Sequence, residues 1–196
     1  MKLIGLTGTT GSGKGYVSAV FSEMGISSID TDAIVHRMYR EDRECIAKLQ
    51  EAFGEITVED GSVDRKKLAS IVFADKEKLE MLNSIVHRMV RREVDRICLA
   101  KKQEGCSLLL LDAPLLYEAG MEDLCHRVIA VTAPESIRLQ RICARDRINL
   151  EAAEQRMKNQ HSDAYFAEKA DFVICNDGKT SVPNQVEQII GELRNG

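Results

Sequence analysis

The chain has 196 residues, of which 44% are hydrophobic and 30% are charged, and its formal net charge at pH 7 is −4. These values are ordinary for a globular protein with one well-filled core. The acidic balance gives no general reason to expect nucleic-acid binding, so any anion site must be local. No apolar run approaches the roughly 20 residues of a membrane span. The six cysteines lack C-x-x-C spacing, so we expect reduced thiols in a cytoplasmic protein, with neither a zinc site nor a disulfide framework.

Short apolar strands alternate with helical segments along the chain. In chain order, strands are predicted at 2–8, 26–30, 108–112, 127–133 and 171–175. Helical segments are predicted at 14–24, 31–53, 64–103, 138–147 and about 183–194, with a long helix at 75–103 inside the third segment and a loop at 55–63. This alternation predicts an α/β fold with a five-stranded parallel sheet that is flanked by helices. Ligands of such sheets bind beyond the carboxyl ends of the strands.

The segment GTTGSGKGYV, from Gly8 to Val17, follows the first predicted strand. It matches the phosphate-binding pattern G-x-x-x-x-G-K. Gly8, Gly11 and Gly13 allow the backbone around Ser12 to curl so that its amides face phosphate oxygens. Lys14 then reaches the β- and γ-phosphates beside the positive end of the next helix. A glycine-rich turn without a ligand is the alternative, and the flanking strand and helix favour a nucleotide site.

Two residues depart from the usual pattern directly after the lysine. Gly15 stands where a Ser or Thr hydroxyl normally holds Mg²⁺, and the bulky Tyr16 follows it. Because Mg²⁺ usually keeps several water ligands, a further water can fill the missing position. The sequence therefore predicts weaker metal binding rather than loss of the nucleotide site.

Carboxylates follow two other predicted strands. Asp32 is a candidate base for an attacking hydroxyl, with Asp30 as a helix cap or a supporting group. Helix capping is the alternative for both residues. Asp112, at the end of LLLLD, is a candidate Mg²⁺ ligand, directly or through water, and a turn acid is its alternative.

The predicted helix RLQRICARDR carries four arginines against one acid, Asp146. Arg138, Arg141 and Arg145 share one helix face. In a kinase, Arg141 and Arg145 would close over the phosphates and stabilise the charge that develops during transfer. A solvated helix surface is the alternative.

Together these motifs resemble the dephospho-coenzyme A kinase family. The similarity covers nearly the whole chain, and its motifs stand in the family's order. Residues 5–39 contain the phosphate loop and the I-D-x-D motif, and residues 53–87 contain F-G, D-G-x-x-D-R-x-x-L and L-N-x-x-H. PLLYE at 114–118, the arginine helix, Gln160, ADFVI and the N-x-G of residues 176–178 follow. Gly15-Tyr16 and His87-Arg88 replace the family's usual Ser-Thr and His-Pro.

The resemblance implies that ATP, with Mg²⁺, phosphorylates the ribose 3′-hydroxyl of dephospho-CoA, the last step of coenzyme A synthesis. It assigns the phosphates to Gly11–Gly13 and Lys14, the base to Asp32, and a lid to the helix of Arg141 and Arg145. It places Asn176 and Gly178 near adenine. It places the following residues in the acceptor region: Arg65, Asn83, His87, Pro114, Leu115 and Leu116.

The expected organisation is a single P-loop kinase domain over residues 1–196. A core comprises about 1–54, 104–137 and 170–196, an acceptor subdomain about 55–103, and a lid about 138–169. We expect a small-molecule substrate, no nucleic-acid or membrane partner, and a monomer or weak homo-oligomer. Two alternatives remain open: a kinase for another small acceptor such as a nucleoside monophosphate, and a nucleotide-binding paralogue with catalysis weakened by Gly15.

Overall fold

The computed structural model describes residues 1–58 and 60–195. The chain divides into two compact units. Residues 1–29 and 105–196 form the first, here called the sheet unit, and residues 30–104 form the second, here called the helical unit. The predicted division into core, acceptor subdomain and lid concerns function and stays a prediction.

The sheet unit contains the predicted five-stranded sheet, in the order β2-β3-β1-β4-β5. Its strands run β1 Lys2–Gly8, β2 Ser27–Asp30, β3 Leu108–Asp112, β4 Arg127–Thr132 and β5 Phe172–Cys175. β1 is central and pairs in parallel with both β3 and β4. In this register Leu6 lies opposite Asp112, so the residues that follow β1 and β3 meet at one edge of the sheet. The predicted fold class is confirmed.

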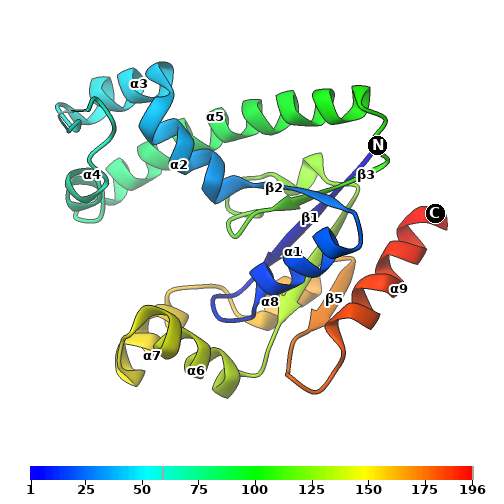
Figure 1. The fold of residues 1–196 in the computed structure, drawn as a ribbon. Helices are drawn as coiled ribbons and strands as arrows, with labels where there is room; N and C mark the ends of the chain where they lie inside the picture. The colour runs from blue at the N-terminus through cyan, green and yellow to red at the C-terminus, as the bar shows by residue number, and fades with distance from the viewer. Residues whose placement is uncertain (59, 196) are drawn as a thin grey trace. The chain divides into compact units, whose positions relative to one another are not determined.

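Two helices cover one face of this sheet. α1 (Lys14–Glu23) and α9 (Val182–Asn195) contact each other, and they contact β1 and β5 respectively (Figure 1). Alternate strand residues such as Leu6, Leu110 and Val131 point into the core beneath them, together with Phe21 and Val186. These residues are at most 2% exposed, so hydrophobic burial fixes the start of α1 close to the end of β1.

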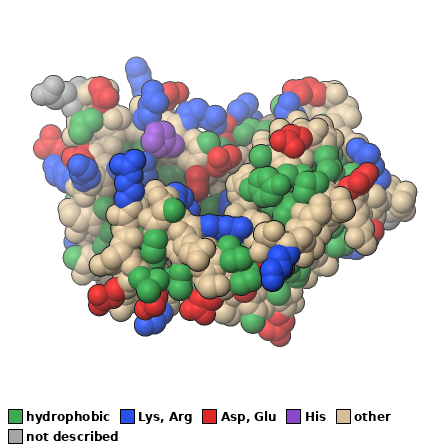
Figure 2. All heavy atoms as spheres, turned by 60° about the horizontal axis from the view of Figure 1, so that its bottom comes forward, with side chains coloured by type: hydrophobic (Ala, Val, Ile, Leu, Met, Phe, Trp, Pro, Cys, Tyr) green, Lys and Arg blue, Asp and Glu red, His purple; other side chains and the backbone are tan. Residues whose placement is uncertain are grey.

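Three further helices follow β4. They are α6 (Glu135–Asp146), α7 (Leu150–Lys158) and α8 (Asp163–Lys169). α6 packs on α7, and α8 contacts β1 and β4. A short 3₁₀ turn at Glu122–Leu124 precedes β4. Both signs of charge occur across the face that Figure 2 shows, with hydrophobic side chains between them.

The helical unit contains α2 (Thr31–Glu41), α3 (Arg43–Phe53), α4 (Arg65–Val72) and the long α5 (Lys76–Gln103), with α2, α3 and α4 packed on α5. The segments predicted to be helical at 31–53 and 64–103 each contain two helices, and the long helix predicted at 75–103 is α5. An aspartate begins the second helix of each segment. Asp42 is extended (φ −85°, ψ 103°) and accepts a hydrogen bond from the amide of Cys45. Asp75 accepts from the amides of Glu77 and Lys78. Each aspartate caps a new helix, which costs less than leaving the first amides unsatisfied.

Candidate active site

The phosphate loop joins β1 to α1 over residues 9–13. Gly13 precedes α1 in the left-handed conformation (φ 89°, ψ 28°), and Gly11 has φ 78°. A Cβ on Gly13 would overlap the side-chain amide of Asn176, and one on Gly11 would lie 2.8 Å from the carbonyl oxygen of Arg138. Conformation and space therefore both require glycine at these two positions.

The backbone amides of the loop and the Ser12 hydroxyl form few hydrogen bonds with the rest of the protein. The amide of Ser12 donates to the carbonyl of Thr9 over 3.2 Å. Within residues 1–58 and 60–195, no hydrogen bond engages the amides of Gly11 and Gly13, and the buried Ser12 hydroxyl has no partner. α1 adds the positive end of its dipole at the same place. Free amides at a helix N-terminus form a site for an anion such as phosphate.

A cation and an anion face each other beside the loop. Lys14, the first residue of α1, forms an ion pair with Asp112 at the end of β3. Their side chains are 19% and 11% exposed, so the pair is partly shielded from water. A Cβ built on Gly15 meets no described atom within 4 Å, which leaves open space where a hydroxyl side chain would stand.

Arg141 of α6 holds the loop from its outer side. Its guanidinium donates to the carbonyls of Gly11 (3.3 Å) and Ser12 (3.1 Å), and to the carbonyl (3.1 Å) and side-chain oxygen (3.3 Å) of Asn176. The side-chain nitrogen of Asn176, which is 6% exposed, donates to the Ser12 carbonyl over 2.8 Å. Because the carbonyls are engaged on this side, the peptide amides of the loop point the other way.

Arg145 lies one helical turn further along α6 and is largely exposed. It donates to both oxygens of Asp146 (2.8 and 2.9 Å) and, over 3.4 Å, to the hydroxyl of Thr10. Asp146 also pairs with Arg156 of α7. The hydrogen bond from Arg145 lowers the pKa of Asp146 below its ordinary value. Asp146 therefore links Arg145 of α6 to Arg156 of α7, and Arg145 also contacts the loop at Thr10.

The loop after β5 carries the predicted adenine-site residues. Gly178 has φ 77°, and Asp177 accepts from the amides of Lys179 (2.9 Å) and Thr180 (2.7 Å). These backbone hydrogen bonds lower the pKa of Asp177. The turn therefore has a defined shape, and its first residue, Asn176, is bonded directly to the phosphate loop.

The PLLYE segment follows β3 in the sheet unit. Leu115 is 52% exposed, whereas Leu116 is fully buried. The hydroxyl of Tyr117 is buried, with no partner among the described residues, and burial raises the pKa of Tyr117 to about 12. Leu116 therefore packs in the core, whereas Leu115 and Glu118 are exposed and Pro114 is half-buried.

The remaining predicted site residues lie in the helical unit. Asp30 caps α2 by accepting from the amide of Ala33 over 3.0 Å, so its predicted capping role is confirmed. Asp32 lies in the first turn of α2 and lines, with Asp30, an open hollow of about 440 Å³. The guanidinium of Arg65, at the start of α4, lies 3.2 Å from Nδ1 of His36.

Asn83 and His87 lie one turn apart on α5, so they share one face of that helix. Both are half-buried. The structure thus brings together the phosphate loop, Lys14, Asp112, Arg141, Arg145 and Asn176 in the sheet unit. The assignment of Asp32, Arg65, Asn83 and His87 to the same site stays a prediction.

Several loop contacts were not predicted from the sequence. Thr9 and Thr10 bond to Asp163 and Gln160 of the segment around the start of α8. Asp163 follows Ser162, which caps α8 by accepting from the amide of Tyr165. An acid in the first turn of a helix is typical of capping, so the sequence carries no signal for its contact with the loop.

No helix of the described residues is long and apolar enough to cross a membrane. Across the same residues, no group of three or more His, Cys, Asp or Glu side chains is arranged to hold a metal ion.

Comparisons with known proteins agree on one family. Residues 2–181 match the family model described as dephospho-CoA kinase. The chain is 39% identical to the dephospho-CoA kinase of Bacillus licheniformis, over 90% of this chain and 88% of that one. It is 35% identical to that of Corynebacterium diphtheriae, over 98% of this chain and 96% of that one.

Solved structures extend the similarity to three dimensions. TT1252 from Thermus thermophilus superimposes with a TM-score of 0.80 at 33% identity, covering 98% of this chain and 97% of that one. The dephospho-CoA kinase from Campylobacter jejuni gives 0.72 at 28% identity, covering 99% and 98%. The shikimate kinase from Acinetobacter baumannii gives 0.53 at 17% identity, covering 100% and 94%, which is a similarity of fold alone.

Proposed function

The chain belongs to the dephospho-CoA kinase family, and on this basis we propose that it transfers the γ-phosphoryl group of ATP to the ribose 3′-hydroxyl of dephospho-CoA. The products are CoA and ADP, and the reaction is the final step of coenzyme A biosynthesis. The observation that carries the proposal is the phosphate loop, in which free amides and Lys14 converge next to Asp112. The acceptor is assigned through the family.

The loop binds the triphosphate of ATP. The amides of Gly11, Gly13 and their neighbours, with the N-terminus of α1, surround the β- and γ-phosphates. Gly8, the last residue of β1, lies so close to β4 that a Cβ there would overlap the carbonyl oxygen of Val131. Ser12, Gly15 and Tyr16 complete the segment around the phosphates. Because these groups are fixed before the reaction, little reorganisation is needed as charge moves toward the transferring phosphoryl group.

Lys14 and the α6 arginines stabilise that charge. Lys14 lies at the first position of α1, and Arg145 reaches the loop at Thr10. Arg141 bonds to loop carbonyls, so its contribution includes holding the loop in shape. Asn176 and Gly178 bind the adenine end of ATP, with Asn176 bonded to the loop itself.

Asp32 acts on the acceptor. Its carboxylate accepts the proton of the 3′-hydroxyl and orients this oxygen toward the γ-phosphorus. Through the family resemblance we assign contact with the acceptor to five further residues: Arg65, Asn83, His87, Pro114 and Leu115. Positioning of the two substrates supplies most of the rate enhancement, since phosphoryl transfer needs little covalent chemistry from the protein.

The residues present fit a Mg²⁺ ion that is held mainly by ATP. Asp112 is the partly buried carboxylate next to the loop and would hold the ion through water, and the open space at Gly15 accommodates a further water. When bound, the ion neutralises phosphate charge. The lid formed by α6 to α8 closes over the nucleotide and excludes water, which prevents hydrolysis of ATP.

A coupled assay for ADP release, with a panel of acceptors over a magnesium series, tests the proposal. We expect ADP release that depends on dephospho-CoA. Equal or faster release with a nucleoside monophosphate would favour a kinase for another acceptor. ATP binding without acceptor-dependent release would favour a paralogue with weakened catalysis. A cytoplasmic location and a monomer or weak homo-oligomer remain predictions.

A further inference from the structure

A buried arginine links α6 to the phosphate loop. Arg138 is only 6% exposed. Charged side chains are seldom buried so deeply unless they have a partner. Its Nε donates to the carbonyl of Thr10 over 3.1 Å, and another guanidinium nitrogen lies 3.2 Å from Oδ1 of Asp163. The carboxylate of Asp163 therefore compensates the buried charge of Arg138.

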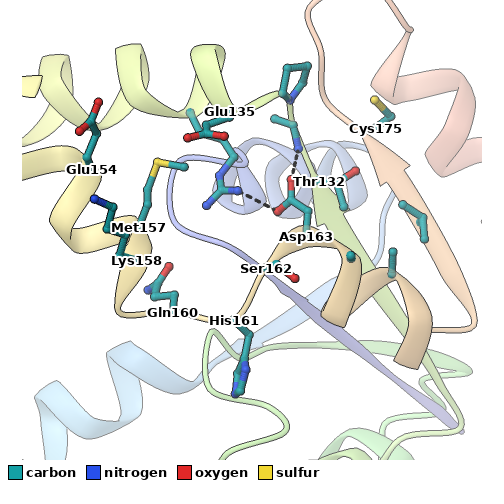
Figure 3. A pocket seen from close by; sticks show the side chains of 16 residues that line it. Thr132, Glu135, Glu154, Met157, Lys158, Gln160, His161, Ser162, Asp163 and Cys175 are labelled. Atoms are coloured by element: carbon teal, nitrogen blue, oxygen red, sulfur yellow. Dashed lines mark hydrogen bonds and ion pairs between the residues drawn. The ribbon is translucent and has the colours of Figure 1, made fainter.

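Asp163 in turn contacts two other segments. Its Oδ1 accepts a hydrogen bond of 2.5 Å from the hydroxyl of Thr9, which is itself 4% exposed. Its Oδ2 accepts one of 3.4 Å from the amide of Ala133, directly after β4. Figure 3 shows Asp163 with its contacts to the arginine and to this amide, at the wall of a cavity between α6, α7 and α8. One carboxylate thus joins the phosphate loop, α6, α8 and the end of β4.

Two further contacts hold the peptide groups on either side of Thr10. The amide of Thr10 donates to Oε1 of Gln160 over 3.0 Å, while Arg138 holds its carbonyl. Thr10 is therefore bonded to Arg138 of α6 and to Gln160 in the turn between α7 and α8. Because the carbonyls of Thr10 and Ser12 accept from arginines of α6, the amides of Gly11 and Gly13 in the same trans peptide groups are directed away from those arginines, where a phosphate can accept from them.

We propose that Asp163 is a positioning residue for ATP binding, which acts through Arg138 and Thr9. Asp163 does not touch the nucleotide. It holds Arg138 and Thr9 in the orientation that shapes the loop, so that the affinity for ATP depends on the segment that leads into α8. This inference rests on the proposed binding of ATP at the loop. It adds a residue that neither the sequence motifs nor the family resemblance marked.

A purely structural role for Asp163 predicts a different result. An acid in the first turn of α8 stabilises that helix, and its loss would lower the melting temperature without changing the affinity of the folded protein for ATP. Asp171 provides the matched control. It accepts a hydrogen bond of 2.8 Å from the amide of Val128 and pairs with Arg127 over 3.5 Å, at the opposite ends of the strands from the loop.

The experiment compares Asp163→Asn with Asp171→Asn by three measurements: calorimetric Kd for ATP, KM for each substrate, and melting temperature. For Asp163→Asn we expect the Kd and KM for ATP to rise on the order of tenfold, as for loss of a charge-assisted hydrogen bond, with the KM for dephospho-CoA within about twofold of wild type. For Asp171→Asn we expect a lower melting temperature and an unchanged Kd for ATP.

If Asp163→Asn does not fold because Arg138 has lost its carboxylate partner, a second variant provides the test. Arg138→Gln combined with Asp163→Asn removes both charges, so it leaves no uncompensated charge in the interior. We expect its melting temperature to approach that of wild type while its Kd for ATP stays raised. An ATP affinity equal to that of wild type, in either folded variant, would overturn the inference. If the wild-type protein bound no ATP, the proposed function would fall, and this inference with it.

Discussion

Replacement of Gly13 by alanine tests the geometry of the phosphate loop most severely. Gly13 has φ 89° and ψ 28°, a left-handed conformation that costs an L-residue with a Cβ roughly 1–2 kcal/mol. The new Cβ would also overlap the side-chain amide of Asn176. That amide donates to the carbonyl of Ser12 over 2.8 Å in a buried position.

Displacement of Asn176 adds a second cost. Loss of a buried hydrogen bond costs about 1–3 kcal/mol, and the lower end applies because Arg141 also donates to the Ser12 carbonyl. Gly13→Ala should therefore lower the free energy of unfolding by about 2–4 kcal/mol. It should also weaken ATP binding, since the displaced loop no longer presents its amides correctly.

Gly25→Ala separates the two costs. Gly25 has a similar φ of 80°, and a Cβ there meets no described atom within 4 Å. Its substitution should cost only the conformational part, about 1–2 kcal/mol, and leave ATP binding unchanged. Urea unfolding with equal m-values gives both free energies, and calorimetry gives the affinities. In an Asn176→Ala background the extra cost of Gly13→Ala should shrink. Equal destabilisation by Gly13→Ala and Gly25→Ala, with ATP binding intact, would refute this account of the loop.

Three further predictions concern catalysis, metal binding and thiol reactivity. Asp32→Asn should lower turnover by roughly 10²–10⁴-fold while ATP affinity is largely kept, and near-wild-type turnover would remove Asp32 from its role as base. Gly15→Ser, for which the structure has room, should lower the Mg²⁺ concentration that gives half-maximal rate and keep or raise turnover. An unchanged magnesium titration would show that the missing hydroxyl is unimportant. Burial, with Asp42 nearby, raises the pKa of Cys45 to about 11, so iodoacetamide at pH 8 should modify this thiol only after unfolding. Equal labelling of native and unfolded protein would contradict its burial.

The parallel sheet could be predicted because its three inner strands are buried on both faces. Leu108–Asp112 reads as a continuous apolar run that ends in an acid, and the structure makes it β3, with all five residues buried. The phosphate loop was equally visible, since glycine spacing and the lysine define it locally. Features that depend on neighbours in the sequence were therefore predicted well.

The start of the long helix near Asp75 was predicted, whereas the helix boundary at Asp42 was missed. Asp42 lies inside a segment that looks helical throughout. The side-chain oxygen of Asp42 nevertheless bonds to the amide of Cys45, which favours a new helix start over continuation. An aspartate followed by Glu two positions later, as Asp42 is, was the available signal.

The contacts of Asp163 could not be predicted from the sequence. Asp163 and Thr9 are separated by 154 positions, and Asp163 and Arg138 by 25. No periodicity or spacing rule relates residues so far apart. Only the folding of α6 and α8 around the end of β4 brings these side chains together, and their burial then makes the pairing necessary.

The most direct test of the account is an NMR titration of the ¹⁵N-labelled protein with a non-hydrolysable ATP analogue and Mg²⁺. We predict that the amide signals of Gly11, Gly13 and Lys14 shift more than any others, because these groups bind the phosphates. Binding of the analogue that left these three amide signals in place would contradict the account.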